Sequence, residues 1–468
     1  MTAILNPTTG RQLREVPDST PAEVDAAFEA ARAGLAEWKA LAATERGAML
    51  MRVADAMERR ADEFARIESE NMGMPLAGTR AMTLRAAGTF RYFGGYADKL
   101  GGETIPVAGP YHTYTRREPH GVVVAIVPWN APLIFATKKM APALAFGNAC
   151  LLKPAQESPL TALLLGELLA EVGLPAGLAR VLTGGRAVGE QLVGDPRADF
   201  VIFTGSHLGG KAVAAAAARN LTPVALELGG KSPQLVFADA DLDAALDGVV
   251  AGIFGECGQM CIAGSRVLVD ERIADRFVAE LVERTRALRV GDPLQEGIQV
   301  GPQTTATQRD KTVAMIERAR SEGAVVAAAA ELPTDPELSG GYFVAPTLFT
   351  DVAPELEIAR EEVFGPVLVA ATFADEEEAV RLANDTPFGL SAGVWTTSAA
   401  RAHRVAAAID AGTIWLNTYA AISDLVPFGG IGLSGHGREG GSSAAQLYTR
   451  VKSVWTALTD GLPPGVAL

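Results

Sequence analysis

The stretch GVVVAIV (121–127) begins the part of the chain that decides its fold. Short apolar runs of this kind predict buried strands, and from residue 121 onward they alternate with segments of helical pattern. Regular alternation of strand and helix predicts a doubly wound, mostly parallel sheet in an α/β protein. The further runs of this series are ACLLK (149–153), ARVLT (179–183), FVIFT (200–204), VALEL (224–228) and QLVF (234–237).

The chain on either side of this series predicts three other units. TPAE (20–23) has the pattern of a capping box with proline at the first helical position, so we expect a helical N-terminal portion through about residue 97. The alternation returns more loosely after residue 265, which predicts a second α/β domain. The polar segment 101–121 contains the alternating run YHTYTRR and predicts a projecting hairpin. The C-terminal residues 459–468 show no strand pattern.

Composition favours a small-molecule substrate. The chain has 468 residues, enough for about three domain-sized units. Its net charge of -14 argues against a general affinity for nucleic acid or anionic lipid. Three cysteines without a CxxC pair indicate free thiols in a reducing compartment, and we expect no metal site. We find no signal-peptide pattern and no apolar run near the ~20 residues of a membrane helix, so we expect a cytoplasmic protein with no membrane partner.

Cys261, in GQMCIAGSR (258–266), is the candidate nucleophile. It follows an expected helix over 241–255, and the small residues after it leave room for a substrate. A catalytic thiol needs a helix-terminal or electropositive setting, because few free thiols are ionised at neutral pH. The alternative for any cysteine is a buried, inert side chain. We favour that interpretation for Cys150, which adjoins an apolar strand. Cys257 is intermediate between a catalytic and an inert cysteine.

Two polar residues at predicted strand ends could act with this thiol. Glu227 lies near the end of the run VALEL and is followed by Leu228 and two glycines, where the reversal of the chain exposes a side chain to a crevice. It is either a base that activates water or half of a salt bridge, for example with Lys231. Asn130, in PWNAP (128–132), could donate its amide to an oxyanion or cap the helix that begins near Pro132.

A dinucleotide site is best placed at FTGSHLGGK (203–211), which follows a strand and opens a helix. Backbone amides at the N-terminus of that helix can meet a pyrophosphate. The formal GxGxxG matches between Gly430 and Gly440 lack a preceding strand and a crossover helix, so we reject them. Lys153, at the end of the neighbouring strand, could contact ribose hydroxyls or could be an ordinary solvated lysine.

Taken in order along nearly the whole chain, these segments resemble the NAD(P)-dependent aldehyde dehydrogenase superfamily, in its hydrolytic, non-acylating form. No single motif is decisive, but the motifs occur together and in the family's order. They are PWNAP (128–132), LKPA (152–155), FTGS (203–206), LELGGKSP (226–233), GQMCIAGSR (258–266), EEVFGPV (361–367), NDTPFGLSAGVWT (384–396), TIWLN (413–417) and PFGG (427–430).

The resemblance implies the oxidation of an aldehyde to a carboxylic acid with NAD(P). Cys261 would attack the aldehyde, and the Asn130 amide with the Cys261 backbone N–H would hold the oxyanion. Glu227 would activate the water that hydrolyses the resulting thioester. Glu439 matches a buried glutamate that would relay protons. The positions that match cofactor contacts are Trp129, Lys153, Gln156, Gly205, Ser206, Gly210, Glu362 and Phe364.

Two positions depart from the family pattern. Gln156 stands where many NAD-preferring members carry glutamate. An amide keeps the hydrogen bond to the ribose and removes the repulsion of a 2′-phosphate, so we expect NADP to be tolerated alongside NAD. Lys138 stands where members often carry an aromatic residue. It either pairs with a carboxylate or polar group on the aldehyde or extends to solvent at the tunnel mouth, and the second interpretation is favoured here.

The resemblance also implies a division of the chain. Residues 1–100 and 120–229 would form the cofactor-binding domain, and 230–433 a catalytic α/β domain. Residues 101–119 with 448–457 would form a β-hairpin oligomerisation arm. An exposed hairpin is a poor feature for a monomer, so we expect a homodimer or homotetramer.

Two other functions compete with hydrolytic oxidation. A CoA-acylating semialdehyde dehydrogenase would pass the acyl group from cysteine to CoA, but such enzymes generally lack the glutamate matched by Glu227. A non-catalytic binding or structural relative would have no use for Cys261, Glu227 and Asn130 together. The sequence does not identify the aldehyde.

Overall fold

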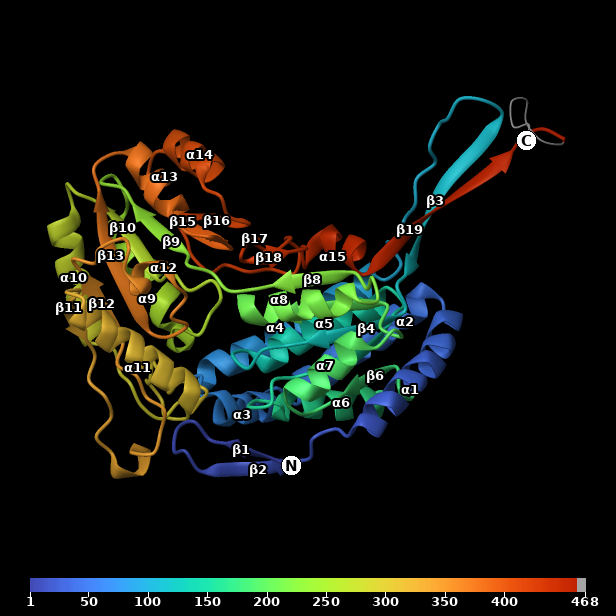
Figure 1. The fold of residues 1–468 in the computed structure, drawn as a ribbon, viewed down its shortest axis with the longest axis horizontal. Helices are drawn as coiled ribbons and strands as arrows, with labels where there is room; N and C mark the ends of the chain where they lie inside the picture. The colour runs from blue at the N-terminus through green and yellow to red at the C-terminus, as the bar shows by residue number, and fades with distance from the viewer. Residues whose placement is uncertain (461–468) are drawn as a thin grey trace.

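The computed structural model describes residues 1–460. These residues form two central sheets with their helices and a projecting two-stranded arm (Figure 1). The C-terminal residues 461–468, for which the sequence predicts no strand, lie outside the described residues. No helix within the described part of the chain is long and apolar enough to cross a lipid bilayer.

The first sheet confirms the doubly wound, mostly parallel arrangement. Its strand order is β18-β8-β7-β4-β5-β6, and every pair except β18 with β8 is parallel. The chain starts at β4 in the middle, runs outward to β6, and returns to build β7 and β8 on the other side. Side chains that follow β4, β5, β7 and β8 therefore meet at one edge, outside the carboxyl ends of the strands. The strands are β4 (Val122–Ile126), β5 (Ala149–Lys153), β6 (Ala179–Val181), β7 (Phe200–Thr204), β8 (Val224–Glu227) and β18 (Gly435–His436).

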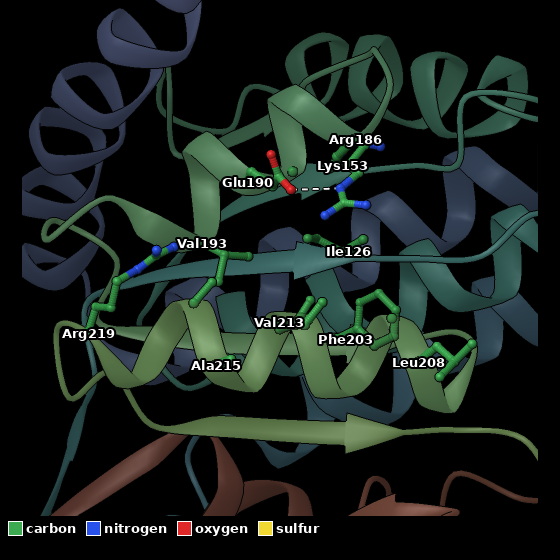
Figure 2. A pocket seen from close by; sticks show the side chains of 14 residues that line it. Ile126, Lys153, Arg186, Glu190, Val193, Phe203, Leu208, Val213, Ala215 and Arg219 are labelled. Carbon is green, nitrogen blue, oxygen red and sulfur yellow. Dashed lines mark hydrogen bonds and ion pairs between the residues drawn. The ribbon is translucent and has the colours of Figure 1, made fainter.

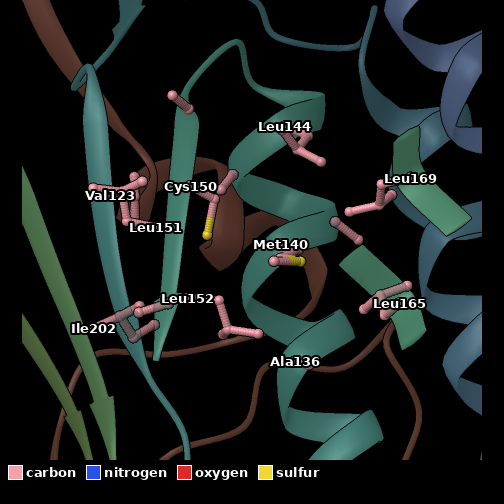
Figure 3. Packing of buried hydrophobic residues seen from close by; sticks show 14 of the residues in the cluster. Val123, Ala136, Met140, Leu144, Cys150, Leu151, Leu152, Leu165, Leu169 and Ile202 are labelled. Carbon is pink, nitrogen blue, oxygen red and sulfur yellow. The ribbon is translucent and has the colours of Figure 1, made fainter. Parts of the chain in front are cut away.

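The chain moves from β4 to β6 in one direction and to β7 and β8 in the other. Right-handed crossovers in opposite directions place helices on both faces of the sheet. Figure 3 shows the face on which α5 and α6 pack against β4 and β5. Cys150 lies inside this core with no exposed surface, as expected for an inert cysteine. Burial raises the pKa of its thiol to about 12. The helices are α5 (Pro132–Ala145), α6 (Leu160–Glu171), α7 (Arg186–Gly194) and α8 (His207–Ala218).

The N-terminal portion is helical from Pro21 onward, and its first helix begins at the predicted capping box. Thr20 Oγ1 accepts a hydrogen bond from the Glu23 backbone N–H at 3.2 Å, and the Glu23 carboxylate accepts from the Thr20 N–H at 2.7 Å. The expectation of an entirely helical portion is wrong before Pro21, where two short antiparallel strands form a hairpin. Those strands are mostly exposed, so their sequence carries little alternation. The elements are β1 (Thr2–Leu5), β2 (Gln12–Val16), α1 (Pro21–Ala40), α2 (Ala43–Arg59), α3 (Ala61–Met72) and α4 (Leu76–Tyr96).

The second sheet has the order β11-β12-β13-β10-β9-β15-β16 and is parallel except for β11. It includes QLVF as part of β9, so this run does not continue the first sheet as the alternation alone indicated. The strands are β9 (Pro233–Val236), β10 (Arg266–Asp270), β11 (Val325–Ala329), β12 (Thr347–Thr350), β13 (Val367–Phe373), β15 (Ser391–Trp395) and β16 (Thr413–Leu416). The helices are α9 (Leu242–Phe254), α10 (Ala274–Arg286), α11 (Ala306–Ser321), α12 (Glu357–Arg360), α13 (Glu376–Asn384) and α14 (Ala399–Ala408). The small elements β14 (Phe388–Gly389), β17 (Ile431–Gly432) and α15 (Gly441–Leu447) connect the two units.

The arm is built from two strands that are distant in the sequence. β3 (Tyr111–Pro119) pairs antiparallel along its whole length with β19 (Thr449–Ala457). Within 101–121 itself, the expected hairpin is reduced to a single bridge between Thr104 and Tyr114. The arm extends away from both sheets (Figure 1), and Trp455 on it is 61% exposed.

Candidate active site

Most of the predicted site residues line one cavity of about 170 Å³, which we call the thiol cavity. Its walls come from the carboxyl ends of β4, β7 and β8 and from loops of the second sheet unit. The predicted residues that line it are Trp129, Asn130, Gly205, Ser206, Glu227, Cys261, Glu362 and Phe364.

Glu227, the last residue of β8, is 4% exposed, and neither carboxylate oxygen has a hydrogen-bond partner in the described structure. The alternative salt bridge with Lys231 is wrong, because the Lys231 ammonium donates to the Ile358 carbonyl at 2.8 Å. Burial, followed by the nearby charge of Glu439, raises the pKa of Glu227 well above its ordinary value. An unsatisfied buried carboxylate is costly to folding, so its retention indicates a chemical use.

Cys261 lies half-buried in the loop that follows α9, with its thiol lining the cavity. The loop reaches this position through a strained turn, in which Glu256 and Cys257 have φ of 49° and 57°. Gly258 is required next, since a Cβ there would lie 2.1 Å from the Gly365 carbonyl oxygen. Burial raises the pKa of the Cys261 thiol to about 12, so the resting thiol is protonated and needs a base.

Cys257 has a structural role. Its side chain is 1% exposed, and its thiol donates to the Gly301 carbonyl oxygen at 2.9 Å. It holds the turn before Cys261 against the second sheet unit and does not line the thiol cavity.

Asn130 connects the first sheet to the cysteine loop. Its side-chain Nδ2 donates to the Gln259 carbonyl oxygen at 2.6 Å. The alternative role as a helix cap is wrong, because α5 begins at Pro132 with no side-chain capping bond. A carboxamide has two N–H groups, so Asn130 can hold the loop with one and offer the other to an oxygen in the cavity.

The two glycines after Glu227 make room for the second carboxylate of the cavity. The Gly230 N–H donates to Glu362 Oε1 at 3.1 Å, and a Cβ on Gly229 would lie 2.0 Å from Glu362 Oε2. The Trp129 and Phe364 rings meet edge to face at 5.3 Å on the same wall. The wall of the thiol cavity is therefore built from three motifs, LELGG, PWNAP and EEVFG.

A second, open cavity of about 670 Å³ lies between α7 and α8 (Figure 2). Lys153 lines it and is only 7% exposed, so the alternative of a solvated lysine is wrong. Most of the other residues that line this cavity could not be predicted from the sequence, because they lie on the surfaces of α7 and α8 and belong to no motif. Those that carry charge or project most clearly are Arg186, Glu190, Leu208 and Arg219.

The loop from 203 to 209 lines both cavities, so one elongated ligand can pass from one to the other. Ser206 caps α8 by accepting from the Gly209 N–H at 3.1 Å, which leaves the helix N-terminus facing this passage. The Ser206 cap uses the Gly209 N–H, and the other N–H groups of this helix N-terminus together with a buried lysine fit the phosphates and ribose of a dinucleotide. The rejected GxGxxG matches lie around β17 and β18, and β18 pairs antiparallel with β8, so they do not form the first turn of a βαβ unit.

Three predicted residues lie outside both cavity walls. Gln156 Nε2 donates to Thr2 Oγ1 at 2.7 Å, on the N-terminal hairpin. Gly210 allows α8 to approach Leu228, whose Cδ2 would lie 2.7 Å from a Cβ there. Glu439 is buried behind Glu227 and forms an ion pair with Lys139. Lys311 and Gln308 line the thiol cavity but were not predicted, since they lie on α11, where no motif marks them.

Comparison with known proteins agrees with this geometry. The sequence matches the Aldehyde dehydrogenase family over residues 1–454. It is 43% identical over 456 residues to a betaine aldehyde dehydrogenase of Brucella anthropi, covering 97% of this chain and 93% of that protein. The crystal structure of PnpE in complex with nicotinamide adenine dinucleotide superimposes with a TM-score of 0.96 at 40% identity, covering 99% of this chain and 96% of that one. Betaine aldehyde dehydrogenase from Staphylococcus aureus in complex with NAD⁺ gives a TM-score of 0.96 at 36% identity, covering 98% and 92%. The chain therefore belongs to the aldehyde dehydrogenase family.

Proposed function

We propose that this enzyme oxidises an aldehyde to a carboxylic acid with NAD, through a thioester on Cys261 that water hydrolyses with the help of Glu227. The observation that carries the proposal is the convergence of a thiol and an unpartnered buried carboxylate on one cavity. Neither group has another role in the described structure.

The first step is the attack of the Cys261 sulfur on the carbonyl carbon, which forms a thiohemiacetal. The Asn130 amide and the Cys261 backbone N–H donate to the oxyanion as it develops. A thiol with a pKa near 12 must lose its proton for this attack. Glu227 is suited to accept it, because burial makes its carboxylate a stronger base than an ordinary glutamate.

NAD is the oxidant, since it accepts a hydride from the carbonyl carbon when it is bound. Lys153 and the α8 N-terminus at Ser206 would hold its ribose and phosphates, and Glu362 would hold the nicotinamide ribose. Trp129 and Phe364 close the wall beside it and exclude water. Loss of the hydride leaves a thioester on Cys261.

Hydrolysis completes the reaction. After the proton from the thiol has left Glu227, its carboxylate takes a proton from water, the resulting hydroxide attacks the thioester carbon, and the Cys261 thiolate leaves. The buried Glu227 favours this outcome over transfer to CoA, for which no proton acceptor at this position is needed. The ion pair of Lys139 with Glu439 lies behind Glu227 and offers a route for the proton to leave.

Several finer properties belong to the same proposal. NADP is tolerated alongside NAD because Gln156 carries no charge. Residues 1–100 and 120–229 form the cofactor-binding domain and 230–433 the catalytic domain. The arm of 101–119 and 448–457 joins subunits into a homodimer or homotetramer, and the enzyme works in the cytoplasm. The exposed edge of β3 and β19 supports the arm's role, because an unpaired strand edge is available to a second copy.

The test is the formation of reduced nicotinamide by the purified enzyme with a panel of aldehydes, with NAD or NADP and with or without CoA. We expect CoA-independent turnover that is lost in Cys261→Ala and retained in the matched variant Cys257→Ala, provided that variant folds. Turnover only in the presence of CoA would contradict the role of Glu227. Equal activity of Cys261→Ala and the wild type would contradict the covalent mechanism.

A further inference from the structure

We infer that Lys138 selects aldehydes that carry a carboxylate on the end distant from the carbonyl, and that it disfavours aldehydes that carry a cation. The inference rests on the proposed function and specifies its substrate class.

Lys138 lies beside the thiol cavity. It follows Phe135 by one turn on the same face of α5, and Phe135 lines that cavity. The Lys138 ammonium lies 5.4 Å from the centroid of the Phe428 ring. Phe428 in turn packs in the apolar cluster that contains Cys261 and Ile262. The lysine therefore lies at the end of an apolar wall that leads to the nucleophile.

The ammonium of Lys138 has no counter-ion. Lys139, its neighbour, is paired with Glu439, but no carboxylate oxygen in the described structure lies within 4.0 Å of the Lys138 nitrogen. Asp424 lines the same small cavity as Lys138, and its carboxylate accepts from the Thr89 hydroxyl at 2.7 Å. Arg85 adds a further positive charge nearby.

The side chain is also half-buried, with its ammonium against the Phe428 ring, so it does not extend freely to solvent. Burial lowers the pKa of Lys138, and the charges of Glu439 and Asp424, which line the same small cavity, offset this effect only in part. A partly desolvated ammonium without a partner is a site for an anionic group of a ligand.

The charge of Lys138 reaches the reacting groups. It lowers the pKa of both Cys261 and Glu227, against the larger effect of burial. An aldehyde carbon at Cys261 would therefore place the remote end of an aliphatic chain within the field of this ammonium. A carboxylate at that end gains a charge-assisted contact, and a trimethylammonium group is repelled.

The experiment compares kcat/KM for two pairs of aldehydes that are matched in size. The first pair is glutaric semialdehyde and pentanal. The second is betaine aldehyde and its neutral isostere, in which a carbon replaces the nitrogen. Each is measured with the wild type, with Lys138→Met, which keeps most of the length without the charge, and with Lys138→Arg, which keeps the charge. Lys99→Met is the matched control, since Lys99 is an exposed lysine that pairs with Asp98 on the surface.

We expect the wild type to prefer the carboxylated aldehyde and to discriminate against the cation. Lys138→Met should lower kcat/KM for glutaric semialdehyde by about tenfold to a hundredfold, the usual size of a hydrogen bond to a charged group. It should leave pentanal nearly unchanged and raise kcat/KM for betaine aldehyde relative to its isostere. Lys138→Arg should retain the wild-type order of preference, and Lys99→Met should change nothing.

Equal effects of Lys138→Met on all four aldehydes, in a variant that oxidises pentanal normally, would overturn the role of Lys138 and leave the proposed function intact. Equal kcat/KM of the wild type for betaine aldehyde and its isostere would also overturn the role of Lys138 and leave the proposed function intact. Failure of the wild type to oxidise any of the four would overturn the proposed function and this inference together.

Discussion

Lys139 and Glu439 form an ion pair in which the two side chains are 0% and 6% exposed. The pair joins α5 to the segment that follows β18, and it lies next to Glu227. Burial is the main cause of the raised pKa of Glu227. The Glu439 charge raises this pKa further and the Lys139 charge lowers it, so the pair adjusts the basicity of the carboxylate that the mechanism uses.

Removal of one partner should therefore destabilise the enzyme. We expect Glu439→Gln to lower the free energy of unfolding by about 3–5 kcal/mol, because the Lys139 ammonium is left buried without a counter-charge. The double variant with Lys139→Met should recover most of that loss. Thermal unfolding of the three proteins measures this, and a Glu439→Gln protein as stable as the wild type would contradict the buried pair.

Asn130→Ala should lower kcat by about a hundredfold to a thousandfold, the usual effect of losing one oxyanion-hole donor. Because Asn130 also holds the Gln259 carbonyl, a looser cysteine loop could lower the rate by another route. The rate of Cys261 alkylation by iodoacetamide separates these effects. Alkylation at the wild-type rate together with a low kcat supports the oxyanion role, whereas an equal fall in both supports loop positioning only.

The stability of the enzyme should depend on the ionisation of Glu68. This residue of α3 is 1% exposed and accepts from the Leu133 N–H at 3.0 Å, at the start of α5, and burial raises its pKa from 4.5 to about 7. A raised folded pKa means that the folded state holds a proton which the unfolded state releases. The contribution of Glu68 is therefore fully present below about pH 4.5 and is lost as the pH rises to about 7.

We expect the free energy of unfolding of Glu68→Gln to rise relative to that of the wild type as the pH rises from 5 to 8, by up to ~1.4 kcal/mol per pH unit within the titration range, as measured by denaturant unfolding at each pH. Glu70→Gln is the matched control on the same helix, since Glu70 pairs with Arg66 near the surface. A difference between Glu68→Gln and the wild type that does not vary with pH would contradict the buried titration.

Gln156→Glu should lower kcat/KM for NADP by at least about tenfold and leave that for NAD nearly unchanged, because a carboxylate there repels a 2′-phosphate. Gln295→Glu adds the same charge on an exposed loop of the second unit and should have no effect. A wild type that already uses NADP several orders of magnitude less well than NAD, with no change in Gln156→Glu, would contradict the proposed tolerance.

Much of the first sheet could be predicted from the sequence, because β4, β5 and β7 are buried on both faces and appear as uninterrupted apolar runs. Two residues of the candidate site could be located for the same reason, because Glu227 and Lys153 lie at the ends of such runs. The assignment of QLVF to the second sheet could not be predicted, because a buried strand has the same apolar pattern in either sheet.

Other features depend on contacts between distant residues. The pairing of β3 with β19 joins strands more than three hundred residues apart. The family resemblance implied this partner, but nothing in YHTYTRR itself specifies it. The N-terminal hairpin reaches Gln156 through Thr2, which no local pattern indicates. The half-burial of Lys138 follows from the position of Phe428 on a remote loop. The periodicity of the sequence indicates which face of each element is buried, but it does not indicate which loops are in contact in the folded chain.

The central claim is that Cys261 carries the acyl group and that Glu227 is the base required for water to release it. The most direct measurement is a single-turnover reaction of Glu227→Gln with an aldehyde and NAD, followed by mass spectrometry of the Cys261 peptide. We predict a burst of about one equivalent of reduced nicotinamide, formed more slowly than in the wild type because the amide cannot take the thiol proton. We also predict a peptide heavier by the acyl group and steady turnover lower by about a hundredfold to ten-thousandfold. A Glu227→Gln enzyme that turns over as fast as the wild type, or a burst that leaves the Cys261 peptide unmodified, would contradict the account.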